Sequence, residues 1–405
     1  MLSLIAFTLC LLAPQPAQPA DIVVGMSAAF SGQSRALGIE LYRGSMAYIE
    51  HVNQSDGVHG NRIVLKAYDD GYNPLPAMRN TLKLLDEDEA FVLMNYVGTP
   101  TVTRLLPLLK MHRHRSAYLF FPFSGALPQR LPPYDQYVFN LRASYQEEIE
   151  RIVDHLLQLG RRNIGVLYQM DAYGRSGWEG ARSSLAARGL SIVAEATYHR
   201  GAAYGDSQAT QVRILRDAGA DVVISIGSYA ASAAFIRDAR DAEWDAPIAN
   251  ISFVASDRML GLLLETEAQT GRDYTHNLVI SQVVPSYESD SLPAAREYRE
   301  LMERYNPSPP AELTPADYRS SPLSTVGFEG FLNAKLLVEI LRRLGPEPDN
   351  TRIAVTAEGI KNFDLGIDRR VSFDPYNHQG LNAVYFETVE NDRLVPLSDW
   401  GSWLQ

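Results

Sequence analysis

The first candidate for chemistry is a glycine-rich turn, LYQMDAYGRSGWEGA at residues 167–181, which joins an apolar run to a helical one. A dinucleotide-binding loop also joins a strand to a helix, because N–H groups at the helix N-terminus bind the pyrophosphate. That loop requires glycines at positions one, three and six, whereas Gly174, Gly177 and Gly180 stand at one, four and seven. The spacing argues against a nucleotide cofactor, and we interpret Glu195, at the end of the next apolar run, as an exposed strand end.

The other reactive side chains also favour structural roles. Asp69 and Asp70 in KAYDDGYNP follow an apolar run and precede a capped helix, where carboxylates commonly orient a turn. His112 and His114 are two residues apart and would not share one face of a helix, so they are a poor zinc site. The sequence contains no G-x-S-x-G nucleophile motif. We therefore expect no catalytic residue, no metal site and no cofactor, and hence no enzyme.

Composition narrows the class of partner. The chain has 405 residues, of which 46% are hydrophobic, so it is long enough for two or three domains with their own cores. Its formal net charge is -11. Nucleic acids and anionic membranes attract clustered lysine and arginine, so this charge argues against either as a partner.

The N-terminus resembles an export signal. An apolar run from Leu2 to Ala13 is too short to cross a bilayer and is followed by a Pro/Gln/Ala spacer, so we expect residues 1–20 to be a signal peptide. The only cysteine, Cys10, lies in this segment, so the mature chain has no disulfide and no thiolate chemistry. No later stretch has membrane-spanning length. We expect a soluble, periplasmic protein.

From Asp21 onward, short β-branched runs alternate with amphipathic stretches of helical length, which is typical of βαβ units on a parallel sheet. Asn73-Pro74 and Thr99-Pro100 each suggest a capping residue before a proline at the first helical position. The alternation restarts after QYVFNLRAS, which predicts two α/β halves of similar size. Expected strands are DIVVGMSA, RIVLKAYDD, AFVLMNYVG, SAYLFFPF, NIGVLYQ, LSIVAEATY, ADVVISIGS, PIANISFV and NLVISQVV. Expected helices are near 36–55, 75–87, 100–112, 145–159, 206–218, 229–242 and 291–305, with one more that follows the glycine turn and ends at Arg188.

The C-terminal region lacks a sheet of its own. A Pro/Ser-rich loop, NPSPPAELTPADYRSSP, precedes an apolar helix, GFEGFLNAKLLVEILRRLG, and a hairpin-like ending. A loop of this length in a compact domain is usually functional or mobile. We expect the helix and the hairpin to pack on the two halves.

Four segments, in order, resemble the type I periplasmic solute-binding proteins of the branched-chain amino-acid-binding type, which serve ABC importers. They are ELYRGSMAYIEHVNQSDGVHGNRIVLKAYDDGYNP, MNYVGTPT, NIGVLYQMDAYGRSGWEGARSSLAARGLSIVAEATY and AAFIRDARDAEWDAPI. The resemblance implies two Rossmann-like lobes with parallel central sheets, joined by a three-crossover hinge that closes on a ligand. It places residues 21–141 and 284–370 in lobe 1, and residues 142–283 and 371–405 in lobe 2.

The resemblance also implies where the ligand binds. In relatives, the loop that is here Gly98-Thr99-Pro100-Thr101 binds the ligand carboxylate through hydroxyls and helix N-terminal amides. Ser124 and Gly125 match the neighbouring ligand loop. Tyr173 and Tyr229 match aromatic contacts from the opposite lobe. A helix N-terminus favours an anion on physical grounds as well.

One departure from the family changes the expected ligand. Amino-acid-binding relatives have a carboxylate on the second lobe for the ligand ammonium, where this chain has Ser252 and Phe253. A buried ammonium without an ionic partner is costly, which argues against a zwitterionic amino acid. Leu37, Tyr96 and Phe253, with Phe123, indicate an apolar or aromatic-lined cleft. It suits an aromatic or aliphatic acid, or a lipid-like molecule with one polar end, although these side chains also fit plain lobe core.

We therefore expect a monomeric binding protein that captures a small molecule between its lobes and delivers it to an inner-membrane transporter. Thr99, Thr101 and Ser124 would hold the polar end of the ligand, and Tyr173, Tyr229 and Phe253 would close over its body. Two alternatives remain open. One is a periplasmic lipid or sterol-like carrier of a non-ABC system, and the other is a ligand-sensing receptor domain.

Overall fold

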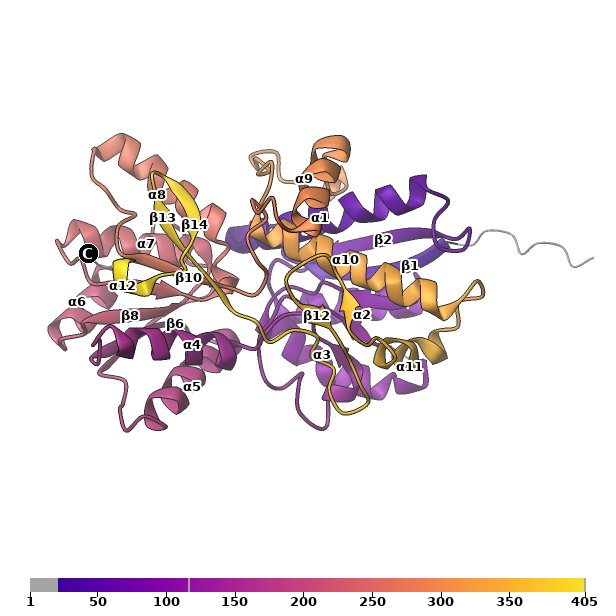
Figure 1. Cartoon of the computed structure of the whole chain (residues 1–405), viewed down its shortest axis with the longest axis horizontal. Coiled ribbons are helices and arrows are strands. Elements are labelled where there is room, and N and C mark those ends of the chain that lie inside the picture. The colour runs from indigo at the N-terminus through magenta and orange to yellow at the C-terminus, as the bar shows by residue number, and fades with distance from the viewer. Residues whose placement is uncertain (1–20, 116, 404–405) are drawn as a thin grey trace, which may run out of the picture.

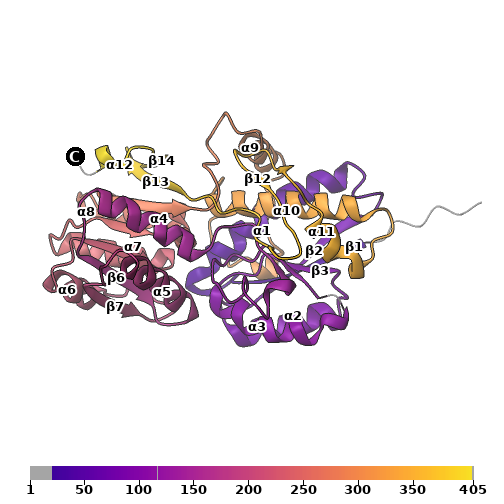
Figure 2. The ribbon, with the colours of Figure 1, turned by 60° about the horizontal axis from the view of Figure 1, so that its bottom comes forward.

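The computed structural model describes residues 21–115 and 117–403, so the expected signal peptide lies outside the described residues. The chain forms two lobes, which lie side by side along the long axis of the molecule (Figures 1 and 2). Each lobe is built around one main sheet. We call the lobe with the five-stranded sheet lobe 1 and the lobe with the seven-stranded sheet lobe 2.

The sheet of lobe 1 is parallel throughout, in the order β2-β1-β3-β4-β5. The helices α1 and α10 pack against each other, as do α2 and α3. The strands are β1 (Asp21–Ala28), β2 (Arg62–Asp69), β3 (Val92–Met94), β4 (Leu119–Phe120) and β5 (Val138–Phe139), and the helices are α1 (Arg35–Gln54), α2 (Pro74–Asp86), α3 (Thr99–Met111), α9 (Pro293–Tyr305), α10 (Thr325–Leu344) and α11 (Ile353–Glu358).

The sheet of lobe 2 has the order β14-β13-β10-β9-β8-β6-β7. Its five strands from β10 to β7 are parallel, whereas β13 and β14 join as an antiparallel hairpin at one edge. The strands are β6 (Ile164–Gln169), β7 (Ala194–Tyr198), β8 (Val222–Ile226), β9 (Ile248–Asn250), β10 (Leu278–Gln282), β13 (Tyr385–Glu390) and β14 (Arg393–Pro396), and the helices are α4 (Tyr145–Gln158), α5 (Ala172–Ala186), α6 (Ala209–Asp217), α7 (Tyr229–Asp241), α8 (Ser256–Thr270) and α12 (Trp400–Trp403).

Three connections join the lobes. The chain crosses after β5, returns after β10, and crosses again after the short pair β11 (Phe363–Asp364) and β12 (Arg370–Val371). The first and third connections pair with each other, because the Asn140 N–H donates to the carbonyl of His378 at 2.7 Å and the Gly380 N–H donates to the carbonyl of Asn140 at 2.8 Å. The expected fold class, two α/β lobes with a three-crossover hinge, is confirmed, and the C-terminal hairpin packs on lobe 2 as expected. The residue boundaries given for the lobes stay a prediction.

Local signals explain most helix boundaries. Asn73 caps α2, with its side chain accepting from the Leu75 N–H at 3.2 Å. The expectation for Thr99 was wrong, because Gly98 occupies the N-cap position of α3 and Thr99 is already helical. Helix α8 was not expected at all. It begins after Ala255, which has a positive φ of 55° and provides no side-chain cap, so the sequence carries no start signal there.

The glycines of the opening turn are packing residues. A Cβ on Gly174 would lie 1.8 Å from the carbonyl oxygen of Gln169, and one on Gly177 would lie 2.7 Å from the side chain of Ile226. Helix α5 can therefore approach β6 and β8 closely only with glycine at these positions. In residues 21–115 and 117–403, no helix has both the length and the apolar character of a membrane span.

Candidate functional site

Most of the predicted site residues follow the carboxyl ends of parallel strands, which is where ligands bind in open α/β sheets. Those from lobe 1 follow β3 and β4, and those from lobe 2 follow β6, β8 and β9. They are Thr99, Thr101, Ser124, Gly125, Tyr173, Tyr229, Ser252 and Phe253.

Phe253 lies at the centre of an aromatic cluster between the lobes. Its ring centroid is 4.4 Å from that of Tyr173 in its own lobe, and 5.5 Å and 5.9 Å from those of Phe123 and Tyr72 in lobe 1. All four side chains are buried. The lobes therefore meet in an apolar, aromatic contact, and the structure is in a closed arrangement here.

Two hydroxyls of lobe 1 lie together beside this cluster. Thr99 Oγ1 and Ser124 Oγ are 2.8 Å apart, and both side chains are buried. The loop before Thr99 depends on Gly98, which has a φ of 97° and whose added Cβ would lie 1.9 Å from the ring of Tyr72. Gly125 is constrained in the same way, because an added Cβ would lie 2.6 Å from the ring of Tyr145.

Three other predicted residues have packing or hydrogen-bonding roles of their own. Thr101 donates its hydroxyl to the carbonyl of Gly98 at 2.6 Å, so that group serves its own helix turn. Tyr96 belongs to a separate core around α2 and α3, where its hydroxyl lies 3.0 Å from that of Thr81. Leu37 is buried in the first turn of α1.

Tyr173 is held by its own helix start. The Asp171 side chain caps α5 and accepts from the Tyr173 N–H at 2.9 Å, and the Tyr173 hydroxyl donates to the carbonyl of Gly227 at 3.2 Å. Tyr229 makes a second contact between the lobes. Burial raises the pKa of its phenol, and a hydrogen bond with the backbone of Ala36 in α1 partly offsets that effect.

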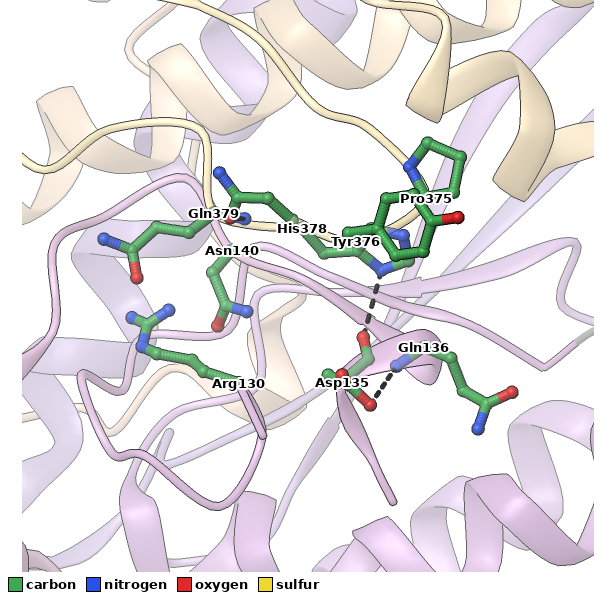
Figure 3. A pocket seen from close by; sticks show the side chains of 9 residues that line it. Arg130, Asp135, Gln136, Asn140, Pro375, Tyr376, His378 and Gln379 are labelled. Atoms are coloured by element: carbon green, nitrogen blue, oxygen red, sulfur yellow. Dashed lines mark hydrogen bonds between the residues drawn. The ribbon is translucent and has the colours of Figure 1, made fainter. Parts of the chain in front are cut away.

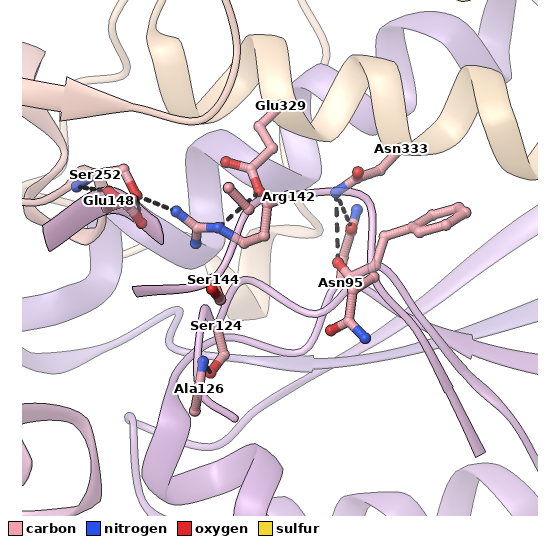
Figure 4. Close-up of polar contacts among 12 residues, drawn as sticks. Asn95, Ser124, Ala126, Arg142, Ser144, Glu148, Ser252, Glu329 and Asn333 are labelled. Atoms are coloured by element: carbon pink, nitrogen blue, oxygen red, sulfur yellow. Dashed lines mark hydrogen bonds and ion pairs between the residues drawn. The ribbon is translucent and has the colours of Figure 1, made fainter. Parts of the chain in front are cut away.

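A buried polar cluster surrounds Ser252, the residue before Phe253 in the chain (Figure 4). The Ser252 N–H and hydroxyl donate to the Glu148 carboxylate at 2.9 and 3.0 Å. The same carboxylate accepts from the Ser281 hydroxyl at 2.7 Å. Arg142 donates to Ser252 Oγ through Nη2, and its Nε lies 3.6 Å from Glu329 Oε1 of α10. The carboxylates therefore come from α4 and α10, and not from the loop after β9.

The ionisation of this cluster follows from burial and pairing. Burial raises the pKa of Glu329 to about 7, against the opposing attraction of Arg142. Burial alone would lower the pKa of the Arg142 guanidinium. The attraction of nearby acidic groups, of which Glu329 contributes most, outweighs this effect, so the pKa lies above its ordinary value. Arg142 is thus a cation in the closed cleft at any physiological pH.

Several groups around the cleft were not identified from the sequence, although the sequence contains a feature that could have indicated one of them. Arg142 ends the apolar run QYVFNLRAS, where a charged residue directly after a strand is unusual for a plain linker. Tyr72 was interpreted only as part of a turn. Tyr145, Glu148 and Glu329 lie on amphipathic helices, where nothing in the sequence separates them from ordinary packing and surface positions.

The paired acids Asp69 and Asp70 have the structural role expected for them. Asp69 Oδ1 accepts from the backbone N–H groups of Phe30 and Gly71 at 2.9 and 2.8 Å. Asp70 accepts from the Ser27 hydroxyl and the Tyr72 N–H, each at 2.8 Å. In the part of the chain that the structure describes, no group of three His, Cys, Asp or Glu residues could hold a metal ion.

A small cavity of about 90 Å³ lies at the hinge (Figure 3). It is lined by both paired connections, with His378 stacked on Phe139 at 3.9 Å and its Nδ1 lying 3.0 Å from the carbonyl oxygen of Asp135. Arg130 lines the same cavity and reaches toward the carbonyls of Arg142 and Ala143 at 3.2 and 3.3 Å. This cavity belongs to the hinge rather than to the interlobe contact.

The chain matches the family model described as periplasmic binding protein over residues 21–393. A solved structure from Rhodopirellula baltica, described as a possible leucine/isoleucine/valine-binding protein, is similar with 28% identity and a TM-score of 0.84, covering 97% of this chain and 100% of that one.

Two solved structures of lower identity share the fold. A branched-chain amino acid ABC transporter protein from Thermus thermophilus with bound valine has 19% identity and a TM-score of 0.80, over 94% of this chain and 96% of that one. A fatty acid ABC transporter substrate-binding protein from Thermomonospora curvata has 18% identity and a TM-score of 0.76, over 93% and 91%. The chain therefore belongs to the periplasmic binding protein family, of the Leu/Ile/Val-binding type, whose members bind substrates and are not enzymes.

Proposed function

We propose that this protein captures a small ligand between its two lobes in the periplasm and delivers it to an inner-membrane ABC transporter. The observation that carries the proposal is the meeting of Phe253 and Tyr173 with Phe123 and Tyr72 across the lobes, at the carboxyl ends of the parallel strands. Aromatic faces at this position can enclose the body of a ligand, while the paired hydroxyls of Thr99 and Ser124 hold a polar end.

Hinge closure is the proposed mechanism. A ligand that contacts both lobes binds the closed state more tightly than the open state, and so shifts the population toward closure. Polar contacts of the closed arrangement support this. Gln169 of lobe 2 lies 3.3 Å from the Tyr72 hydroxyl, and Asp257 of α8 accepts from the Thr325 N–H of α10 at 2.9 Å. Opening would break these contacts, so they already favour the closed state. A ligand then has to supply only the rest of the free energy needed to keep the lobes closed.

The ligand we propose is less polar than an amino acid. The loop after β9 provides Ser252 and Phe253 in place of a carboxylate, and the surrounding surface is aromatic. Proteins of the same fold are described with valine and as serving a fatty acid transporter, so the fold alone leaves the ligand class open. A lipid or sterol-like carrier of a non-ABC system and a ligand-sensing receptor domain remain the second candidates, since the aromatic lining suits both.

The same proposal covers location and assembly. Export of the chain by the N-terminal apolar segment would place it in the periplasm, and we propose that it acts there as a monomer. We also propose residues 21–141 and 284–370 as lobe 1 and residues 142–283 and 371–405 as lobe 2.

Thermal-shift screening of amino acids, aromatic acids, fatty acids and sterols tests the function, because a ligand that binds only the folded protein raises its melting temperature. We expect Tyr173→Ala to abolish the shift given by the best ligand, since the ring of Tyr173 packs on Phe253. Tyr48→Ala is the matched control. Tyr48 is also buried, and it lies in the core of lobe 1, where it packs on Phe331.

Both variants lose a buried aromatic side chain, at a cost of about 3–5 kcal/mol in stability, so the comparison isolates binding from folding. The site is wrong if Tyr173→Ala retains the wild-type affinity for a ligand found in the screen. A clear shift with micromolar leucine would refute the claim that the ligand is less polar than an amino acid.

A further inference from the structure

Arg142 is a buried cation that lies against aromatic rings in the closed cleft. It follows β5 at the first connection between the lobes, and it is 1% exposed. Its guanidinium carbon lies 4.4 Å from the ring centroid of Phe123, a member of the aromatic cluster between the lobes, and 6.0 Å from that of Tyr145. The cation therefore borders the surface that we propose for the ligand body.

Its hydrogen-bonding capacity is only partly used. Nη2 donates to Ser252 Oγ and Nε faces Glu329 Oε1 at 3.6 Å, which is beyond hydrogen-bonding distance. Nη1 is buried, and within residues 21–115 and 117–403 it has no hydrogen-bond acceptor. In Figure 4, Nη1 is the guanidinium nitrogen with no dashed line. Leaving a charged N–H group buried and unpaired is costly, so a hydrogen-bond acceptor at Nη1 would stabilise the closed cleft.

The neighbouring carboxylates face Ser252, Ser281 and Arg142. Glu148 accepts three hydrogen bonds, two from Ser252 and one from Ser281. Glu329 faces Arg142 itself. A ligand ammonium at this place would meet the like charge of Arg142, whereas a ligand carboxylate would find a charged donor with an unused N–H group.

We propose that Arg142 binds the carboxylate of an apolar monocarboxylic acid that carries no amino group beside that carboxylate. This inference rests on the proposed function and names the ligand class of the same site. The guanidinium holds the carboxylate through Nη1, and the aromatic cluster of Phe253, Tyr173 and Phe123 encloses the apolar body. The paired hydroxyls of Thr99 and Ser124 then bind a second polar atom or the far carboxylate oxygen.

Two matched pairs of ligands test the proposal by calorimetry and thermal shift. They are 3-phenylpropanoic acid against phenylalanine, and 4-methylpentanoic acid against leucine, and each pair differs only in the α-amino group. The protein is first unfolded in guanidinium chloride and refolded to remove any ligand carried through purification. We expect at least one acid to bind, and its amino-acid counterpart to bind at least tenfold more weakly.

Arg142→Met should lower the affinity for that acid at least tenfold and remove the preference for the acid over the amino acid. Arg142→Lys keeps the charge without the planar group, so it should fall between the wild type and Arg142→Met and serves as the test if Arg142→Met does not fold. Arg240→Met is the control. Arg240 is a buried arginine of lobe 2 that donates to the carbonyls of Trp244 and His276, each at 2.8 Å, and its loss should leave the preference unchanged.

Three results would overturn the inference. They are binding of the amino acid at least as tight as that of its acid, no response to either acid, and a folded Arg142→Met or Arg142→Lys protein with wild-type affinity for the acid. Tight binding of leucine alone would leave the interlobe binding function intact and refute only the acid. Acid binding that persists unchanged in Tyr173→Ala would instead contradict the interlobe site on which both proposals rest.

Discussion

At the scale of single residues, the closed cleft depends on close approaches that leave no room for larger side chains. Phe253 contacts the other lobe, with its ring centroid 5.9 Å from that of Tyr72 and 5.5 Å from that of Phe123. Tyr72 can take that position only because the residue beneath its ring is Gly98. The loop that presents Thr99 and the aromatic surface that faces lobe 2 are therefore fixed by the same glycine.

Gly98→Ala is expected to destabilise the protein and to weaken ligand binding together. The new Cβ would lie 1.9 Å from the ring of Tyr72, on a backbone with a φ of 97°. Gly160→Ala is the matched control, because Gly160 also has a positive φ, 77°, but its Cβ would meet nothing within 4 Å. The control measures the strain of an alanine at a positive φ, about 1 kcal/mol, whereas Gly98 also has a ψ of 143°, which adds to the strain there.

Urea unfolding should therefore show a loss for Gly98→Ala that exceeds the loss for Gly160→Ala by about 2 kcal/mol, in line with overpacking of a buried site. Only Gly98→Ala should weaken the ligand-induced shift. Equal losses from the two variants would mean that the ring of Tyr72 moves aside freely and does not hold the loop.

Sequence reasoning identified loops better than it identified individual contacts. The turns after β3, β4, β6 and β8 were placed correctly because short β-branched runs end in capping residues and glycines. The loop after β9 was not, because β9 ends at Asn250 and the expected strand PIANISFV ran on beyond it. Arg142 and Glu148 were not, because their roles depend on pairing between segments far apart in the chain, with Glu148 of α4 bonding Ser252 and Arg142 facing Glu329 of α10. Such pairs have no local pattern to detect.

At the scale of elements, α8 and α10 form a polar contact between the lobes. Asp257, in the first turn of α8, accepts from the backbone N–H of Thr325 at the start of α10 at 2.9 Å, and from the Tyr287 hydroxyl at 2.8 Å. A carboxylate at a helix N-terminus is favoured by the unpaired N–H groups and the helix dipole. In this protein one lobe thus supplies a cap to a helix of the other.

Asp257→Ala should therefore favour the open state. The variant loses a charge-assisted hydrogen bond of about 1.5–3 kcal/mol that exists only when the lobes are closed, so ligand affinity should fall by roughly tenfold or more. Small-angle scattering without ligand should show a larger radius of gyration than for the wild type.

Asp273→Ala is the control for this change, because the Asp273 carboxylate accepts from the N–H and the hydroxyl of Thr275 at 2.6 and 3.0 Å, within its own loop of lobe 2. It should leave both the affinity and the radius of gyration unchanged. Affinity for the ligand that is equal in Asp257→Ala and the wild type would show that the contact does not contribute to closure.

Helix α8 also shows where element prediction fails. Its sequence is amphipathic enough to form a helix, but it starts after Ala255 with no side-chain cap and directly follows the 3₁₀ turn Ser252–Val254. The start of α8 is stabilised by the contact of Asp257 with α10. Because that contact forms only in the folded protein, the local sequence does not indicate it. Elements with local caps, such as α4 with its capping box at Ser144 and Glu147, were predicted within one residue.

At the scale of the whole molecule, three buried acids in different places share one property. Burial raises the pKa of Asp70, Glu329 and Glu387 to about 7 in each case. Asp70 directly follows β2 in lobe 1, Glu329 lies in α10 at the cleft, and Glu387 lies in the hairpin strand β13 of lobe 2. Both lobes therefore contain carboxyl groups that take up protons when the chain folds.

The free energy of unfolding should consequently fall as pH rises from about 4.5 to 7. In this window the three groups hold protons in the folded protein but have lost them in the unfolded chain, whose ordinary values are 3.8 for Asp70 and 4.5 for the glutamates. Each group contributes at most about 1.4 kcal/mol per pH unit. The melting temperature should be higher at pH 5.5 than at pH 7.5, although His155, whose pKa burial lowers, acts in the opposite direction below about pH 6.5.

Glu387→Gln isolates one of these groups. The amide retains an oxygen for the Gln282 side chain, which now donates to Glu387 at 2.8 Å, and it cannot ionise. The variant should match the wild type at pH 5.5 and exceed its melting temperature at pH 7.5, where the wild type must either hold a proton or bury a charge. The contrary result is a melting temperature of the variant that changes between pH 5.5 and 7.5 by the same amount as that of the wild type. This result would mean that Glu387 is already ionised in the folded protein at pH 5.5, and that the pH dependence arises from the other acids.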